Sequence, residues 1–283
     1  MPRPRFSLSS YLYADRRLGR EHLREISGAG FDAIELFALR THVDYHNESA
    51  IANLQQDLAG ARLVLDSVHA PISEGMSGGR SSVPLNLASP DGPSREHAVD
   101  EALQALHIAR RLPFSVLVVH PGVPRRQQQT PVDNNRDAAR RSIETLATAA
   151  EPLGVTIAVE LIPNTLSKPE SLVYFIEDVL EAGAASICLD LGHAHLGGDV
   201  VDTIETVSEH IAAVHAHDNR GREDEHLLPF EGTIDWPAAL TTLQKVGYEA
   251  PIVLELASRG STPETLARAS LARRRMEQLL TTL

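Results

Sequence analysis

The feature of this sequence that most limits its fold is the regular alternation of short β-branched runs with longer segments of helical periodicity. Strands that alternate with helices form parallel sheets, because each helix carries the chain back to the start of the next strand. Eight such units in 283 residues predict a single (β/α)8 barrel, an α/β fold, as one domain over residues 1–283. The eight runs are residues 5–10, 32–37, 62–69, 115–120, 155–160, 186–190, 211–217 and 251–256.

The segments between the runs carry the start and stop signals of helices. Residues 95–112 show an apolar stripe with a period near 3.6, and residues 134–154 end on Gly154. Residues 167–183 begin with Ser167, two residues before Pro169, and end on Gly183. Two long connections, 70–94 and 218–234, contain Gly, Pro and Ser and follow predicted strands. In a barrel these are the positions of functional loops.

Composition supports the fold class and limits the partners. Aromatic residues make up only 4% of the chain, so Val, Ile, Leu and Ala must fill the core, which favours α/β over an all-β sandwich. The single cysteine, Cys188, excludes an intramolecular disulfide and a cysteine-based zinc knuckle. We find no apolar run of membrane-spanning length and no signal-peptide pattern, and expect a cytoplasmic protein without a membrane partner. A net charge of −12 disfavours nucleic acid as a partner without excluding it.

Six consecutive predicted strands end in side chains that can bind a metal ion. The carboxyl ends of parallel strands in a barrel face one rim, so groups far apart in sequence converge there. Imidazole and carboxylate groups hold Zn²⁺, Mn²⁺, Co²⁺ or Mg²⁺ without cysteine. The sequence therefore predicts a divalent metal site at this rim. Its candidate ligands are His69, His120, Glu160, Asp190, His193, His215, Asp224, His226 and Glu255.

Each of these residues also has an alternative interpretation, in which it is part of the packed structure and binds no metal. A single histidine after an apolar run is more often a hydrogen-bonded core or rim residue than a ligand. That interpretation is weaker for Glu160, Asp190 and Glu255, because an unpaired carboxylate at the end of a buried strand is costly and favours a nearby cation. For His195 and His217 the sequence leaves three options open. Each residue orients a metal ligand by a hydrogen bond, contacts the substrate, or lies on the outward face of its strand. Glu35, at the end of the second run, approaches the site or anchors a helix.

Several short sequence motifs in this chain resemble those of the xylose-isomerase-like TIM-barrel superfamily, and the similarity covers nearly the whole chain. They are SVHAP, LNLASPDG, VVHPG, VELIPN, LDLGHAH, HAHDNRG, DEHLLPFEGTIDW and VLEL. The superfamily contains sugar-phosphate isomerases and epimerases and also endonuclease-IV-type DNA repair nucleases. The sequence departs from the family pattern at Phe230, where the loop usually has Gly before Glu-Gly-Thr, so a bulky ring is expected to reshape the substrate pocket.

The resemblance to the ketose epimerases implies one Mn²⁺ or similar ion held by Glu160, Asp190, His215 and Glu255. The two glutamates would also exchange protons with the sugar, while the metal polarises the neighbouring oxygens and stabilises the enediolate. The same resemblance implies that His193 binds a substrate hydroxyl and that Arg220 contacts the substrate, although this sequence has Asp218 where the epimerases commonly have Glu. His217, whose alternatives are given above, is a third candidate for a substrate contact.

The resemblance to the nucleases implies a different use of the same rim. That branch holds three Zn²⁺ ions for phosphodiester cleavage, and its ligand pattern maps onto all nine candidate ligands. Against a DNA substrate stand the net charge, the lack of an aromatic wedge in residues 72–86, and the presence of Arg40 as the only cation in residues 37–48.

We therefore expect a metal-dependent isomerase or epimerase that acts on a small-molecule sugar or sugar phosphate, with one to three Zn or Mn ions. An endonuclease-IV-like trinuclear zinc phosphodiesterase is the alternative. A polyol dehydratase or lyase is a further option. By resemblance, a homodimer is one option for the assembly.

Overall fold

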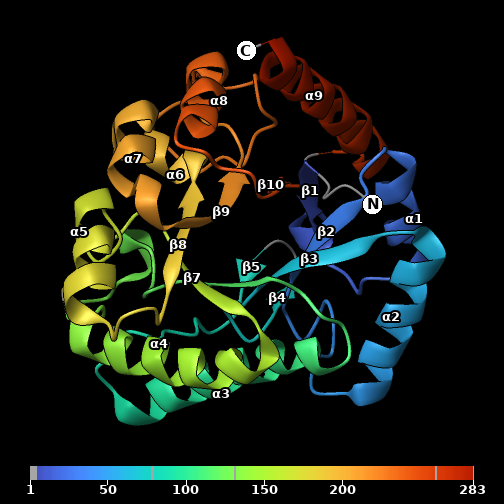
Figure 1. Cartoon of the computed structure of the whole chain (residues 1–283). Coiled ribbons are helices and arrows are strands. Elements are labelled where there is room, and N and C mark those ends of the chain that lie inside the picture. Colours follow the sequence, from blue (N-terminus) through green and yellow to red (C-terminus); the bar gives the residue numbers. More distant parts are fainter. Residues whose placement is uncertain (1–4, 78–79, 131, 259, 283) are drawn as a thin grey trace.

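Eight parallel strands close into a barrel in the computed structural model, which describes residues 5–77, 80–130, 132–258 and 260–282 (Figure 1). Around the barrel the strand order is β1-β10-β9-β8-β7-β6-β3-β2. Every predicted run contains one of these strands, so the predicted (β/α)8 fold is confirmed; the expected domain ends, residues 1 and 283, lie outside the described residues. The strands are β1 (Phe6–Ser9), β2 (Ala33–Phe37), β3 (Val64–His69), β6 (Val116–Val119), β7 (Thr156–Glu160), β8 (Ser186–Asp190), β9 (Ile211–Ala216) and β10 (Ile252–Leu254).

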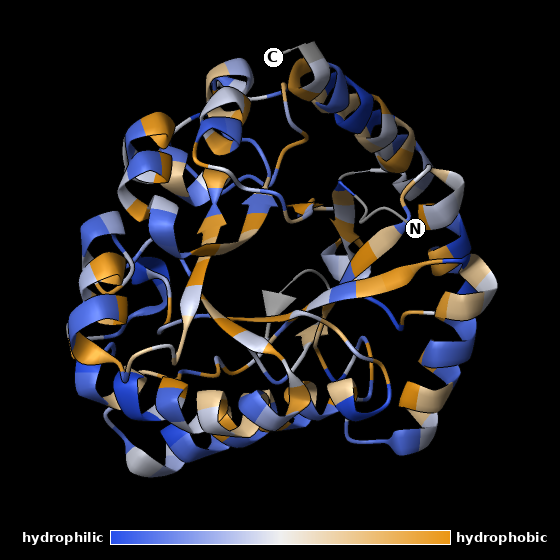
Figure 2. Ribbon diagram, viewed as in Figure 1, coloured by the Kyte–Doolittle hydropathy of each residue, from blue (hydrophilic) through white to orange (hydrophobic). Residues whose placement is uncertain are grey.

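Helices surround the barrel and cover the outer face of its strands (Figure 1). In Figure 2 the strands are coloured mainly as hydrophobic, whereas the helices carry both hydrophobic and hydrophilic residues. This is the pattern expected when each helix packs one side on the sheet and exposes the other to water. The helices are α1 (Arg20–Gly28), α2 (Glu48–Ala61), α3 (Gly92–Leu106), α4 (Arg136–Ala150), α5 (Pro169–Tyr174), α6 (Leu191–Gly197), α7 (Val200–Val207), α8 (Trp236–Lys245) and α9 (Thr262–Thr282).

The structure differs from the sequence expectations in three local details. Helix α3 starts at Gly92, earlier than predicted, because Asp91 caps it by accepting a hydrogen bond from the Ser94 amide at 2.9 Å. The predicted helix over 167–183 is α5 followed by a π-helical turn, Phe175–Val179. The long loop after β3 contains a short hairpin, β4 (Met76–Ser77) and β5 (Arg80–Ser81), which the sequence did not predict; residues 78–79 lie outside the description.

The core of the described residues consists of three apolar clusters. The largest lies between the strands and the helices, and a third is formed by Ala14, Phe37 and Leu39. A small cluster fills the inside of the barrel and consists of Val116, Val118, Ala158, Cys188 and Ala213. Small inner side chains leave room at the carboxyl end of the barrel for polar groups, which is where the candidate ligands lie. Within the described part of the chain, no helix combines the length and apolarity needed to span a bilayer.

Candidate metal and catalytic site

The rim of the barrel brings all nine predicted ligands into three neighbouring groups. Within each group, one candidate ligand atom per residue lies within 4.8 Å of the others. We name them by their composition. The Glu160 cluster is His69, His120 and Glu160; the barrel-centre cluster is Glu160, Asp190, His215 and Glu255; and the loop cluster is His193, His217, Asp224 and His226.

In the Glu160 cluster, two imidazoles share one carboxylate oxygen. Oε2 of Glu160 lies 3.0 Å from Nε2 of His69 and 2.9 Å from Nε2 of His120. Nδ1 of His69 donates to the carbonyl of Ala70 at 2.8 Å, which fixes the orientation of the ring. Burial alone would raise the pKa of Glu160, but the charge of His120 and the hydrogen bonds from the histidines outweigh it and hold the pKa well below its ordinary value.

The barrel-centre cluster is almost completely buried. Nδ1 of His215 lies 3.4 Å from Oε1 of Glu160 and 3.2 Å from Oε2 of Glu255. Within the described residues, Nδ1 of His215 and Oδ2 of Asp190 are buried and have no hydrogen-bond partner. Two carboxylates that face one imidazole nitrogen across these distances form an arrangement that a cation would satisfy.

The loop cluster combines His193 of α6 with three residues of the segment that follows β9. Nε2 of His193 lies 3.2 Å from Oδ2 of Asp224, and Nε2 of His226 lies 3.3 Å from Oδ1. The Nδ1 atoms of both rings face backbone carbonyls, those of Leu161 and Glu255, at 3.0 and 3.1 Å. Each ring therefore presents Nε2 to the cluster, as in metal-binding histidines that donate their other N–H to a carbonyl.

Charge balance within the loop cluster shifts its pKa values. Burial lowers the pKa of His193 and of His226, but the neighbouring carboxylates Asp190 and Asp224 outweigh it and raise these pKa values to about 10 and about 9. Burial likewise raises the pKa of Asp224, but His226 and His193 hold it far below its ordinary value. A bound divalent cation would replace these protons.

His217 occupies a deeper position than a substrate contact requires. Its side chain is 0% exposed, its ring stacks on that of His226 at 4.0 Å, and Nε2 lies 3.1 Å from Oδ1 of Asp190. Both ring nitrogens are buried without a hydrogen-bond partner among the described residues. His217 is also absent from the lining of the cavity above the clusters, so the structure places it with the candidate ligands.

The residues present fit a divalent metal. Buried polar atoms without a partner are rare in folded proteins, and Asp190, His215, Asp224 and His217 each contribute at least one. The donors are imidazole nitrogens and carboxylate oxygens, which suit Zn²⁺ or Mn²⁺. The role of each residue as a ligand stays a prediction.

A narrow cavity of about 90 Å³ opens above the clusters. Besides candidate ligands such as His193 and Glu255, its lining includes Tyr11, Phe37 and Arg126. The sequence did not single out these three, because they are not themselves metal-binding groups at a strand end. The position of Tyr11 directly after the first predicted strand was the one available signal. Burial and the charge of Glu255 raise the pKa of Tyr11 to about 12, so its hydroxyl stays protonated.

The remaining predicted substrate residue lies away from this cavity. Arg220 is exposed, and its guanidinium pairs with Glu225 at 2.5 Å. A contact with substrate would require release of that pair. Its role stays a prediction that the geometry does not favour.

The loop after β9 is held in place by Asp218, which is completely buried. Its carboxylate accepts hydrogen bonds from the amides of Phe230 and Ile234 and from the indole of Trp236, at 3.0, 3.2 and 2.8 Å. Phe230 has a φ of 74°, which explains why glycine suits this position. Its ring packs against Trp236 and does not line the cavity, contrary to the expectation that it reshapes the pocket.

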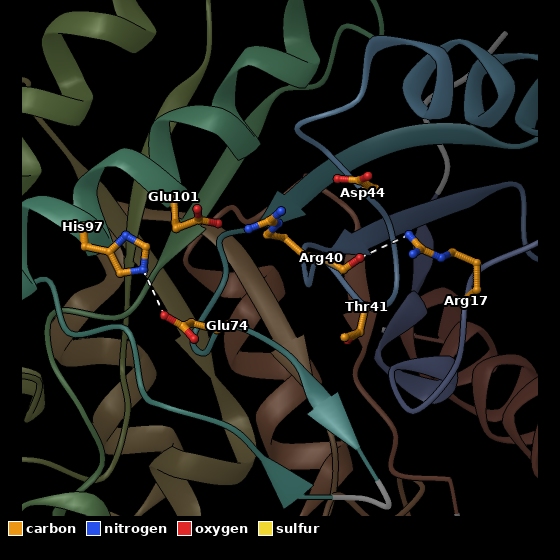
Figure 3. A pocket seen from close by; sticks show the side chains of 7 residues that line it. All are labelled: Arg17, Arg40, Thr41, Asp44, Glu74, His97 and Glu101. Atoms are coloured by element: carbon orange, nitrogen blue, oxygen red, sulfur yellow. Dashed lines mark hydrogen bonds and ion pairs between the residues drawn. The ribbon is translucent and has the colours of Figure 1, made fainter.

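A second cavity, of about 400 Å³, lies between the loop after β2, the loop after β3 and helix α3 (Figure 3). It is lined by charged side chains of both signs, and none of the nine candidate ligands faces it. His97 and Glu74 form an ion pair there at 3.1 Å. The lining residues are Arg17, Arg40, Thr41, Asp44, Glu74, His97 and Glu101.

Sequence comparison gives a match over most of the chain. The family model described as xylose isomerase-like TIM barrel matches residues 23–277. An uncharacterised protein of Methanocaldococcus jannaschii is 30% identical over 258 residues, which is 89% of this chain and 83% of that protein. An inosose isomerase of Bacillus licheniformis is 28% identical over 120 residues, which is 39% of this chain and 43% of that protein.

Structural comparison gives a similar result. The crystal structure of a D-tagatose 3-epimerase-like protein is 27% identical, with a TM-score of 0.81 and coverage of 98% of both chains. The structure of an L-ribulose 3-epimerase, at 20% identity, has a TM-score of 0.79 and covers 99% of this chain and 95% of that one. At that lower identity the likeness shows the fold alone.

Proposed function

Because the chain belongs to the xylose isomerase-like TIM barrel family, we propose that it is a metal-dependent enzyme that isomerises or epimerises a sugar or sugar phosphate. The likeness to a D-tagatose 3-epimerase-like protein over 98% of both chains supports this class of reaction, as does the partial match to an inosose isomerase. Such reactions move a proton at a carbon next to a carbonyl group, which requires acid–base groups and a means to stabilise the enediolate.

The observation that carries the proposal is the arrangement of Glu160 and Glu255. Both carboxylates approach Nδ1 of His215, at 3.4 and 3.2 Å, and both residues line the same cavity. A pair of carboxylates at one site allows one to accept a proton while the other returns it. We assign Glu160 and Glu255 as the catalytic bases and acids of the proposed reaction.

The barrel-centre cluster would hold the metal ion through Glu160, Asp190, His215 and Glu255. When bound, a divalent ion would polarise the substrate oxygens and stabilise the negative charge that develops on them. In this proposal His193, which lines the cavity, contacts a substrate hydroxyl. The burial of His217 favours a role in the loop cluster rather than direct contact with substrate.

A second candidate function rests on the number of clusters. Three neighbouring groups of metal-competent side chains, two of which share Glu160, would suit three Zn²⁺ ions and phosphodiester hydrolysis. The D-tagatose 3-epimerase-like protein and the inosose isomerase described above favour isomerisation, which is why it is our first proposal.

Metal stoichiometry tests the proposal. The chain is purified without a chelator or an affinity metal, and its metal content is measured for the wild type, His69→Ala and Asp224→Ala. About one equivalent, unchanged in both variants, would support a single ion in the barrel-centre cluster and the isomerase proposal. About three equivalents, lowered in either variant, would support the hydrolase.

Activity measurements complete the test. The isomerase proposal predicts metal-dependent exchange of solvent deuterium into a sugar carbon and loss of that exchange in Glu255→Gln. The hydrolase candidate predicts nicking of duplex DNA at abasic sites, with an affinity that falls as salt rises. Nicking without exchange would overturn the first proposal.

A further inference from the structure

Glu35 is a buried carboxylate beneath the barrel-centre cluster. It lies on β2 and is 0% exposed. Its Oε2 accepts a hydrogen bond from the hydroxyl of Ser67 at 2.9 Å and lies 3.0 Å from Nε2 of His215. A carboxylate with no solvent contact is costly to bury, so its contacts need a reason beyond packing.

The contact to Glu35 determines which nitrogen of His215 carries the proton. Ionised carboxylates only accept hydrogen bonds, so Nε2 must be the donor to Glu35. A neutral imidazole has one N–H group, and its other nitrogen, Nδ1, then carries a lone pair. That lone pair faces Glu160 and Glu255, at 3.4 and 3.2 Å, both of which are also acceptors. Only a proton or a cation between them resolves this conflict.

We propose that Glu35 is a positioning residue that holds His215 in the Nε2–H tautomer, so that Nδ1 is directed to the metal ion. This inference rests on the proposed metal-dependent function. Carboxylate partners of metal-bound histidines fix the ring and make the ligand more basic. Glutamine has the same shape at this position, but it lacks the charge, and its NH₂ group can donate to Nε2 and stabilise the opposite tautomer.

The chain offers a matched control in Glu101, which lines the second cavity (Figure 3). This carboxylate is also buried, at 5% exposure, and also has a hydroxyl and an imidazole as partners. It accepts a hydrogen bond from Tyr45 at 2.5 Å, and Nε2 of His46 lies 3.2 Å away. Glu101→Gln therefore makes the same chemical change in a similar setting without touching a candidate ligand.

The test is Mn²⁺ binding to the full-length, chelator-stripped protein by isothermal titration calorimetry. We expect Glu35→Gln to weaken Mn²⁺ binding by about 10- to 100-fold, as is typical when the partner of a metal-bound histidine is changed. Glu101→Gln is expected to bind like the wild type. Circular dichroism checks that each variant is folded. Ser67→Ala, which removes only the hydroxyl donor to Glu35, serves as a milder second variant with a smaller expected loss.

A spectroscopic measurement separates positioning from general stability. In ¹⁵N-histidine NMR spectra of the Zn²⁺-loaded wild type, His215 is expected to carry its proton on Nε2. Equal Mn²⁺ affinity in Glu35→Gln and the wild type, or a proton on Nδ1 of His215, would overturn the positioning role of Glu35. Either result would leave the proposed metal site intact. Absence of metal binding by the wild type would overturn the metal site itself and, with it, the proposed function.

Discussion

Oε2 of Glu160 lies 2.9 Å from Nε2 of His120, while the other oxygen of the same carboxylate faces the barrel-centre cluster. Glu160 is therefore the one residue that belongs to two of the three clusters described. Its position at the end of β7, between β6 and β8, explains why it can reach both. A bridging carboxylate makes the two clusters depend on each other.

Glu160→Gln is expected to affect both clusters at once. The amide keeps the shape of the side chain but lacks the charge and one acceptor oxygen. We expect a loss of metal affinity and a fall in proton-exchange activity of about 10²- to 10⁴-fold, the usual contribution of an acid–base group. Metal content and solvent deuterium exchange provide the measurements. His120→Ala is the comparison variant, since it removes one imidazole partner of Glu160 and leaves the carboxylate itself in the barrel-centre cluster. Full metal content in Glu160→Gln would contradict the bridging role.

His42 provides a pH-dependent element of stability away from the candidate ligands. Its ring is buried, with Nδ1 2.7 Å from the carbonyl of Arg16 and Nε2 3.1 Å from the hydroxyl of Ser10. Burial lowers the pKa of His42 to about 4 in the folded protein. The unfolded chain, with an ordinary histidine pKa of about 6.5, binds this proton more readily. The contribution of neutral His42 to the free energy of unfolding is therefore fully present above pH 6.5 and is lost as the pH falls toward 4.

The expected size of this effect is about 3 kcal/mol between pH 7.5 and pH 4. Urea unfolding of the wild type and His42→Gln at several pH values measures it, because the difference between them cancels the titration of other groups. His97→Gln is the control, since His97 is half-exposed. If the free energy of unfolding falls with pH by the same amount in the wild type and in His42→Gln, His42 is not the group that causes the loss of stability.

The fold could be predicted from the sequence because its signal is repeated eight times. Each strand is buried by helices and so appears as a short apolar run, and the ends of the runs agree with the strands to within two residues. The hairpin of β4 and β5 could not be predicted, since its two-residue strands are too short to show a periodicity. The π-helical turn after α5 left no recognisable pattern either.

The convergence of the nine candidate ligands could also be predicted, because parallel strands in a barrel deliver their carboxyl ends to one rim. How these residues divide into clusters could not. That division depends on which oxygen of Glu160 faces which imidazole, and on the depth of His217 beneath His226. For Glu35 the sequence leaves open whether it approaches the site or anchors a helix. Its contact with His215 spans 180 residues of sequence and results only from closure of the barrel.

Asp218 is expected to be essential to the loop that carries Asp224 and His226. Asp218→Ala would leave the buried donors of Ile234 and Trp236 without an acceptor, at a cost of about 3 kcal/mol or more. Urea unfolding measures the stability, and metal analysis measures the loop cluster. Asp235→Ala is a suitable control, because Asp235 is exposed and only caps α8, a contribution of about 1 kcal/mol. An equal fall in the free energy of unfolding in the two variants would argue against the role of Asp218 in holding the loop.

Gly192 is expected to be required for the position of His217. It lies within α6, where alanine would ordinarily favour the helix by about 1 kcal/mol. A Cβ atom at this position would lie 2.0 Å from Cε1 and 2.4 Å from Nδ1 of His217. The His217 ring is completely buried and stacked on His226, so moving away from the added atom would disturb this packing.

In Gly192→Ala, the clash with His217 should therefore outweigh the gain in helix propensity. We expect the free energy of unfolding to fall by about 1–3 kcal/mol and the metal content to decrease. Gly60→Ala, in α2, is the matched control. A Cβ at Gly60 meets no atom within 4 Å, so this variant is expected to keep or slightly increase the free energy of unfolding. Urea unfolding and metal analysis of both variants provide the measurements. A Gly192→Ala variant as stable as Gly60→Ala, with full metal content, would mean that His217 can shift without disturbing the loop cluster.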